Sequence, residues 1–247
     1  MVCAANGVSF EIPGGKTLGL VGSSGSGKST VARCITRLEK PDAGQIWMGN
    51  IDIARLGSRE LRPVRAEVQM IFQDPSTSMN PRMSAAEIIE EPLLIQNRGT
   101  RDERRGRAVE LMKEVGLSAD WLPRRVTEFS GGQLQRIAIA RALALGPKFL
   151  VLDEALSGLD LSTQSDITDL LRNLQAAYSL TYLLISHDLG LVARLADSIA
   201  IMSAGRIVEQ GPTREIISNP TQPETKVLVA AAERFRTAFA QAKGASA

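Results

Sequence analysis

A glycine-rich segment near the start of the chain constrains the fold more than any other feature. It matches the pattern G-x-x-x-x-G-K-[ST] and consists of Gly22, Ser23, Ser24, Gly25, Ser26, Gly27, Lys28, Ser29 and Thr30. An apolar stretch at residues 17–21 precedes it, and a helical pattern at residues 29–38 follows it. A strand, a loop and a helix in this order predict an α/β fold whose backbone N–H groups and helix N-terminus surround a phosphate. This context disfavours the alternative, a glycine-rich turn that binds nothing.

Four side chains are expected to act on a bound nucleotide. Lys28 is expected to reach its β- and γ-phosphates, and Ser29 is expected to ligate Mg²⁺. Asp153 and Glu154 follow the apolar strand predicted at residues 149–152. Asp153 is placed to hold Mg²⁺ through water, and Glu154 to orient and deprotonate the attacking water. Without the glycine-rich loop, an ordinary acidic strand end would be the simpler interpretation.

Two further polar residues follow predicted strands. His187, the only histidine of the chain, comes after the buried strand predicted at residues 181–185. Ligands of α/β sheets bind at the carboxyl ends of strands, which favours a γ-phosphate contact over a histidine that merely satisfies a hydrogen bond. Gln73 follows the strand predicted at residues 68–72. It is a candidate hinge that also contacts Mg²⁺ or the attacking water, although by itself it is an ordinary loop residue.

A second anion site is predicted where Ser130, Gly131, Gly132 and Gln133 precede a helix at residues 134–144. Ser130 can cap that helix and the glycines can form its turn, which is the plain structural interpretation. The same geometry places a hydroxyl, glycine N–H groups and a helix dipole around an anion. Two anion sites in one chain indicate two phosphate ligands, or one ligand shared between two chains.

The alternation of strands and helices predicts a single α/β domain of residues 1–247 with a parallel core sheet. Residues 1–73 and 146–211 are expected to form the core with a β-subdomain, and residues 74–145 a mostly helical insert. Residues 212–247 are expected to form a helical tail, packed on the body or, alternatively, binding a partner. Further strands are predicted at residues 7–12, 45–48, 198–202 and 206–209. Three prolines are expected to interrupt the insert, namely Pro75, Pro81 and Pro92, and the tail helix is expected to share an apolar face of Leu228, Ala231, Ala232, Phe235 and Phe239.

Composition narrows the function classes. The net charge is +2 with both signs spread along the chain, so nothing in it indicates nucleic acid as a partner. The longest apolar stretches, such as residues 149–152, are far too short to span a bilayer, so work at a membrane would need another subunit to span it. Cys3 and Cys34 fit no metal-binding spacing and are interpreted as two reduced thiols.

The motifs together resemble the ATP-binding-cassette (ABC) ATPases, over residues 7–211 and in that family's order. In this resemblance Gln73 is the Q-loop glutamine, Ser130 to Gln133 the signature, Glu154 the catalytic glutamate, Asp160 the end of the D-loop and His187 the switch histidine. The resemblance implies an ATPase that uses ATP and Mg²⁺ and pairs head to tail with a second such domain. Each ATP would then lie between the phosphate loop of one domain and the signature of the other.

A narrower resemblance is to the second ATPase of oligopeptide, dipeptide and nickel importers. It rests on QMIFQDP at residues 69–75, MNPRM at residues 79–83 and IIEEP at residues 88–92. It implies an ATPase subunit for import of peptides, nickel or a metal chelate, bound peripherally at the cytoplasmic face of the inner membrane. Its partners would be a second ABC ATPase in a heterodimer, two membrane permeases and an extracytoplasmic substrate-binding protein. The alternatives are the ATPase of a soluble phosphonate-degrading (C–P lyase) complex and an exporter ATPase.

One departure from the family concerns the adenine. The family places a stacking aromatic on a strand before the equivalent of Gly7, whereas no Tyr, Trp or Phe precedes Phe10 here. We expect either a different start of the chain or a weaker hold on adenine, by roughly 1 kcal/mol or more.

Overall fold

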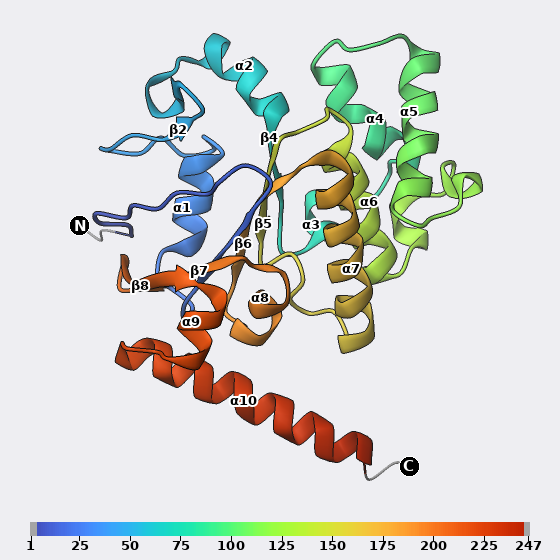
Figure 1. The fold of residues 1–247 in the computed structure, drawn as a ribbon. Coiled ribbons are helices and arrows are strands. Elements are labelled where there is room, and N and C mark those ends of the chain that lie inside the picture. The colour runs from blue at the N-terminus through green and yellow to red at the C-terminus, as the bar shows by residue number, and fades with distance from the viewer. Residues whose placement is uncertain (1–3, 245–247) are drawn as a thin grey trace.

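A twisted six-stranded sheet forms the centre of the molecule in the computed structural model, which describes residues 4–244, with side chains through residue 233 (Figure 1). Its strand order is β4-β5-β6-β1-β7-β8. All neighbouring pairs are parallel except β7 with β8. The strands are β1 (Thr17–Val21), β4 (Val68–Ile71), β5 (Phe149–Asp153), β6 (Thr181–Ser186), β7 (Ser198–Ser203) and β8 (Arg206–Pro212).

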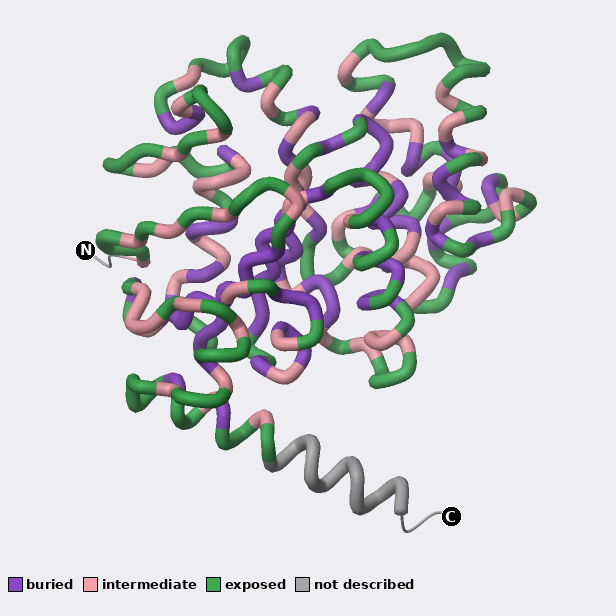
Figure 2. Tube along the Cα trace, in the orientation of Figure 1, coloured by how far each residue is buried: buried purple, intermediate pink, exposed green. Residues whose placement is uncertain are grey.

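Helices cover both faces of this sheet, with α1 on one side and α6 and α7 on the other (Figure 1). The helices are α1 (Lys28–Ile35), α2 (Ser58–Glu67), α3 (Pro75–Ser78), α4 (Ala85–Ile95), α5 (Arg101–Glu114), α6 (Gly131–Leu143), α7 (Leu161–Tyr178), α8 (Leu189–Leu195), α9 (Thr213–Ser218) and α10 (Pro223–Gly244). Short 3₁₀ turns lie at Ile53–Arg55, Ala119–Trp121 and Val126–Glu128. Buried residues concentrate along the sheet and on the helix faces turned toward it (Figure 2).

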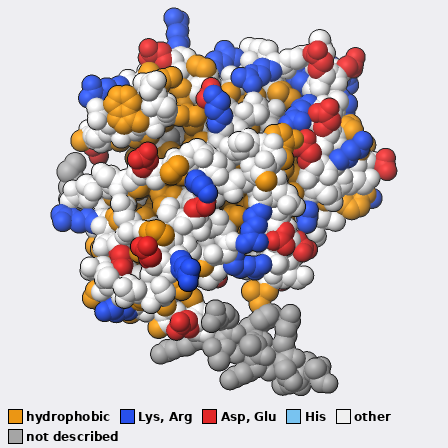
Figure 3. Space-filling model, viewed as in Figure 1, with side chains coloured by type: hydrophobic (Ala, Val, Ile, Leu, Met, Phe, Trp, Pro, Cys, Tyr) orange, Lys and Arg blue, Asp and Glu red, His pale blue; other side chains and the backbone are white. Residues whose placement is uncertain are grey.

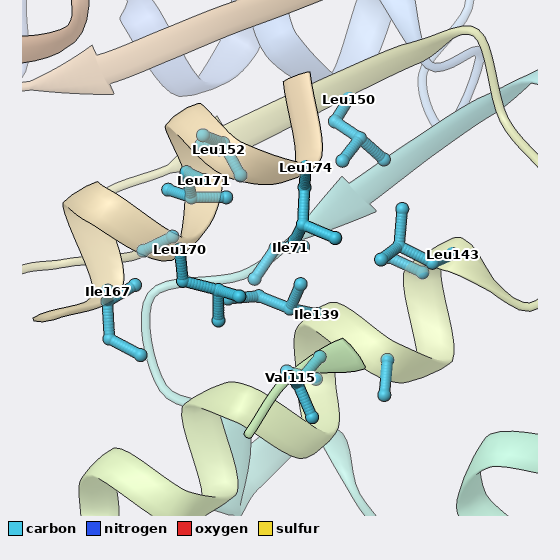
Figure 4. Close-up of a cluster of buried hydrophobic side chains, with 14 of the residues drawn as sticks. Ile71, Val115, Ile139, Leu143, Leu150, Leu152, Ile167, Leu170, Leu171 and Leu174 are labelled. Atoms are coloured by element: carbon cyan, nitrogen blue, oxygen red, sulfur yellow. The ribbon is translucent and has the colours of Figure 1, made fainter. Parts of the chain in front are cut away.

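The side chains of the central strands divide between two apolar clusters because successive residues of a strand point to opposite faces. Leu150 and Leu152 of β5 belong to the cluster that contains α6 and α7, whereas Val151 belongs to the cluster that contains α1. Figure 4 shows Leu152 beside Leu171 of α7. A strand buried on both faces reads as a continuous apolar run, which is why β1, β5 and β6 could be predicted.

The segment between β4 and β5 is helical, as the sequence pattern predicted. Reciprocal capping boxes begin two of its helices, with Ser84 and Glu87 at α4 and Thr100 and Glu103 at α5. Pro92 does not interrupt this segment, contrary to the prediction, because it lies inside α4. Its missing N–H removes one intrahelical bond, yet Ile88 and Leu93 of the same helix remain buried in the core.

Residues 7–12 do not form a strand, so that prediction was wrong. Val8, Phe10 and Ile12 alternate because each packs, partly buried, against the α1-side cluster. One-sided burial produces the same period as a strand without any ladder partner. The predicted strand at residues 45–48 is confirmed only as β2 (Trp47–Met48), which pairs with β3 (Ile51–Asp52).

The chain ends on α9 and α10, and α10 runs along one edge of the body (Figure 1). It packs against α8 and β7. Val229 is buried, and Leu228 and Ala232 pack partly buried against the core, whereas Ala231 is exposed and does not share the predicted face. The predicted apolar positions Phe235 and Phe239 lie outside the residues whose side chains are described.

Acidic and basic side chains are interspersed on the molecular face in Figure 3. Within the described residues, no helix is both long and apolar enough to cross a membrane.

Candidate functional site

Four neighbouring strands bring the predicted site residues to one edge of the sheet. β4, β5, β6 and β1 are parallel neighbours, and their carboxyl ends lie together at one edge, where Val21 pairs with Ser186 and Asp153 pairs with Ile185. Gln73, Asp153, His187 and the glycine-rich loop follow at these ends. The carboxyl ends of parallel strands are where α/β sheets bind ligands, so this edge is the candidate site.

The glycine-rich loop has the backbone that its sequence requires. Gly27, the N-cap of α1, has a φ of 103°, and Gly25 has a φ of 79°, a region that L side chains rarely adopt. A Cβ on Gly27 would lie 1.9 Å from the backbone oxygen of Ala4, so no larger residue fits there. The Ser26 hydroxyl is buried without a hydrogen-bond partner among the described residues. A buried orphan of this kind within an anion-binding loop is available to a ligand oxygen.

Lys28 lies over the loop as a buried cation. Its Nζ donates to the backbone oxygens of Gly22 at 2.7 Å and of Ser23 at 2.9 Å. Burial lowers the pKa of Lys28, and the charges of Glu154 and Asp153 act in the opposite direction. A partly desolvated ammonium interacts strongly with a nearby phosphate, because little water screens the two charges.

The predicted magnesium ligands meet across two elements. Ser29 Oγ of α1 donates to Asp153 Oδ1 of β5 at 3.1 Å. Burial raises the pKa of Asp153 above its ordinary value, although the hydrogen bond from Ser29 acts in the opposite direction. The part of the chain that the structure describes has no cluster of three or more metal-ligating side chains. Two adjacent hard oxygens fit Mg²⁺, which is usually bound by one or two protein oxygens together with waters and substrate phosphates.

Glu154 and His187 form the second pair. His187 Nδ1 lies 2.8 Å from Glu154 Oε2, and the side chains are 61% and 16% exposed, respectively. Glu154 has a φ of 52°, an uncommon conformation for a residue with a side chain. Two hydrogen bonds hold the backbone of Glu154 in this conformation. Its backbone N–H donates to the Ile185 backbone oxygen at 3.0 Å, and its backbone oxygen accepts from Ser157 Oγ at 2.7 Å. Backbone strain that neighbours over-determine is a feature of functional sites.

Gln73 reaches the same edge but makes none of the hydrogen bonds that the described residues form there. It is exposed, one residue beyond Phe72, and Asp74 next to it caps α3 by accepting from Ser76. The structure therefore brings Gln73 to the site without joining it to Ser29, Asp153 or Glu154.

The segment from Ser130 to Gln133 caps α6, as the plain interpretation predicted. Ser130 N–H donates to Gln133 Oε1 at 3.0 Å, and Ser130 Oγ accepts from Gln133 N–H at 3.4 Å. The N–H groups of Gly131 and Gly132 have no acceptor among the described residues. Gly131 is exposed, so this helix end also has free donors for an anion.

Asp160 caps α7 next to that helix end. It accepts from Thr163 N–H at 3.0 Å and from Thr163 Oγ1 at 2.6 Å, and these bonds lower its pKa. A Cβ on Gly132 would lie 2.7 Å from Thr163 Cγ2, so the starts of α6 and α7 are in close contact. No hydrogen bond between described residues joins this pair of helix ends to the glycine-rich loop. Sequence reasoning missed the contact with Thr163, although Asp160 directly before a helical pattern is a readable N-cap signal.

Comparisons with known proteins agree on one family. A sequence profile described as ABC transporter matches residues 5–157. A Brucella ovis protein named for ATP binding in peptide import is 47% identical over 224 residues, 91% of this chain and 71% of its own length. The di/tripeptide transport ATP-binding protein DppF of Pseudomonas aeruginosa is 43% identical over 230 residues, 93% of this chain and 71% of its own length. A solved dimeric ATP-binding cassette, bound to ADP and Pi after hydrolysis, is 32% identical with a TM-score of 0.76, covering 86% of this chain and 92% of its own.

Proposed function

The chain belongs to the ABC transporter family of ATP-binding proteins, and from this premise we propose that it is the ATP-hydrolysing subunit of a peptide importer. The observation that carries the hydrolytic part is the pair of contacts at the sheet edge, Ser29 with Asp153 and Glu154 with His187. The first pair suits a metal–phosphate complex and the second suits an attacking water. Both follow from strand ends that the fold aligns.

The residues of this chain have separate tasks in the proposed reaction. Lys28 and the loop N–H groups would hold the β- and γ-phosphates, and Ser29 and Asp153 would hold Mg²⁺. Bound Mg²⁺ supplies charge neutralisation for the phosphate oxygens. Glu154 accepts a proton from the attacking water, and general-base help of this kind contributes about 10²–10⁴-fold in rate.

His187 orients Glu154 in this proposal. An ionised carboxylate only accepts hydrogen bonds, so its contact with Nδ1 requires the proton on that nitrogen. The other ring nitrogen, Nε2, is then left to contact the γ-phosphate, to which it donates when the ring carries protons on both nitrogens. Gln73 joins the site when the helical lobe, residues 74–145, moves toward the core formed by residues 1–73 and 146–211.

Peptides are the substrate class that the relatives favour. The two curated relatives described above are named for peptide and di/tripeptide transport, rather than for nickel, a metal chelate or a phosphonate-degrading complex. Both alignments cover more than nine-tenths of this chain, which supports assigning it the same substrate class. The substrate itself would be bound by other subunits. No observation favours the soluble C–P lyase complex.

The partners follow from the second anion site. Ser130 to Gln133, together with Asp160, would complete the ATP site of a second ABC ATPase in a head-to-tail heterodimer. The free N–H groups at the exposed start of α6 and the dimeric state of the solved relative support this arrangement. Two membrane permeases and an extracytoplasmic substrate-binding protein would complete the importer, with this chain at the cytoplasmic face of the inner membrane.

Reconstituted transport tests the proposal. Vesicles that contain the permeases and both ATPases should take up labelled di- or tripeptides when ATP is supplied, and Glu154→Gln should abolish uptake while ATP binding persists. Binding persists because the substitution keeps the size of the side chain and leaves the loop and Lys28 intact. Uptake that survives in the Gln variant would disprove the role of Glu154. Uptake of nickel but not of peptide by the wild type would disprove the substrate class.

A further inference from the structure

We propose that α10 braces the active site, and that Glu209 is the positioning residue that holds α10 in place and thereby orients His187. This inference rests on the proposed ATPase function. It follows a continuous chain of contacts from β8 through α10 and α8 to the end of β6.

The first contact fixes the start of α10. Glu209 of β8 accepts from Thr221 N–H at 2.9 Å, from Thr221 Oγ1 at 2.8 Å and from Gln222 N–H at 3.0 Å. These donors directly precede Pro223, the first residue of the helix, so the carboxylate lies at the positive end of the helix dipole. One side chain thus ties α10 to the sheet.

The charge of Glu209 is favoured at this position. Burial raises the pKa of Glu209, but the nearby Thr225 hydroxyl and the donors of Thr221 and Gln222 outweigh burial and lower the pKa to about 2. The Thr225 hydroxyl is itself buried without a well-formed hydrogen bond. Glu209 therefore remains an ionised cap for α10 throughout the neutral range.

The second contact joins α10 to α8. Val229 is buried, and a Cβ on Gly190 would lie 3.9 Å from Ala232 Cβ, which is ordinary van der Waals distance. Gly190 belongs to the first turn of α8, so α10 packs on the end of α8 that is nearest the active site. Helix α8 is packed on its other side against β1 and β6.

The third contact joins α8 to the active site. Asp188 caps α8 by accepting from Gly190 N–H at 2.8 Å and from Leu191 N–H at 3.1 Å. Asp188 N–H in turn donates to Ser186 Oγ at 3.0 Å. His187 is the single residue between these two attachments, so its backbone follows any shift of α8.

The ring of His187 depends on that backbone because most of it is free of packing. It is 61% exposed, and its described polar contact is the 2.8 Å approach to Glu154. A misplacement of about 1 Å at a catalytic group can cost about 10²-fold in rate. A small tilt of α8 is therefore sufficient to affect turnover without changing the phosphate-binding loop.

The test uses His187 as its own reporter. Because the chain has one histidine, the imidazole carbon-bound protons of the isolated protein give a single set of NMR signals to follow. We compare Glu209→Ala, which removes the acceptor, with Glu209→Gln, whose single amide oxygen still accepts from one of the two backbone N–H groups. Glu103→Ala is the matched control, because Glu103 also caps a helix by accepting a backbone N–H, from Thr100 at 2.6 Å, but in the helical insert.

Glu209→Ala should shift the His187 signals and lower the kcat of the assembled ATPase about tenfold, within the range that misplacement produces, while the KM for ATP is unchanged. Glu209→Gln should restore part of the kcat and part of the wild-type His187 signal positions, and Glu103→Ala should change neither. A purely structural role would lower the melting temperature and leave the His187 signals of the folded protein where they are. That result, with backbone amide exchange showing α10 released, would overturn the proposal.

A second variant is needed because α10 could remain packed against α8 even when Glu209 is replaced. Ala232→Glu places a carboxylate against the start of α8, beside Asp188, and should displace α10 from that turn. Unchanged His187 signals in both variants would also overturn the proposal. Failure of the proposed function is distinguishable, since a wild-type complex without ATPase activity can still show the coupling between residue 209 and the His187 signals.

Discussion

At the scale of single residues, the proposed active site consists of two pairs that each join different elements. Ser29 of α1 meets Asp153 of β5, and Glu154 after β5 meets His187 after β6. The identity of these residues was predictable, because each follows an apolar run or lies in the glycine-rich loop. The left-handed backbone of Glu154 was not predictable, since it depends on hydrogen bonds with Ile185 and Ser157.

Removing the Ser29 hydroxyl should weaken the dependence of ATP binding on magnesium. In Ser29→Ala the Asp153 carboxylate remains, but the metal loses one of its two protein oxygens and the loop keeps its shape. ATP affinity measured with Mg²⁺ should fall toward the value measured with EDTA, which itself should not change. Ser58→Ala at the exposed start of α2 is the control. An undiminished effect of Mg²⁺ in Ser29→Ala would contradict the assignment of this ligand.

At the scale of elements, the two glycines at the start of α6 differ: packing requires Gly132, whereas Gly131 is available for binding. Gly132 is in close contact with Thr163 of α7, whereas a Cβ on Gly131 would meet nothing within 4 Å. Neither residue has a positive φ. The fold therefore requires Gly132, and an approaching ligand is the remaining reason for a glycine at position 131.

The two glycines should respond differently to the same substitution. Gly132→Ala should lower the free energy of unfolding by about 1–3 kcal/mol, because Thr163 is β-branched, is held by Asp160 and cannot move its methyl group easily. Gly131→Ala should leave it unchanged or raise it by up to about 1 kcal/mol. Gly131→Ala should nevertheless reduce turnover of the assembled complex. Equal destabilisation by the two variants, measured by urea unfolding, would contradict this division.

Most elements were predictable because burial imposes a period on the sequence, and the exceptions have physical reasons. Residues 7–12 alternate as a strand would, yet pack on one side without a ladder. Helix α8 was not predicted because its seven residues are too few for a helical period, although Asp188 is a strong N-cap signal. The hydrogen bonds that Glu209 accepts from Thr221 and Gln222 were not predictable. They join β8 to the start of α10, and the separate short helix α9 lies between the two in the sequence.

At the scale of the whole molecule, we propose that the sheet edge and the start of α6 act as two separate half-sites. Local motifs predicted both, but their spatial relation depends on how the helical segment between β4 and β5 packs. In the described part of the chain, Ser130 bonds only within its own helix start, and the loop residues bond only around the sheet edge. This separation supports one ATP site that is completed by another chain.

The most direct test of this shared site is Ser130→Arg, measured in two preparations. In the isolated chain, ATP binding should equal that of the wild type, because Lys28 and the glycine-rich loop are untouched. In the complex with the partner ATPase, turnover at the partner's site should be lost, because the arginine fills the space where that ATP approaches. Loss of ATP binding by the isolated Ser130→Arg chain, or full turnover in the complex, would contradict the shared site.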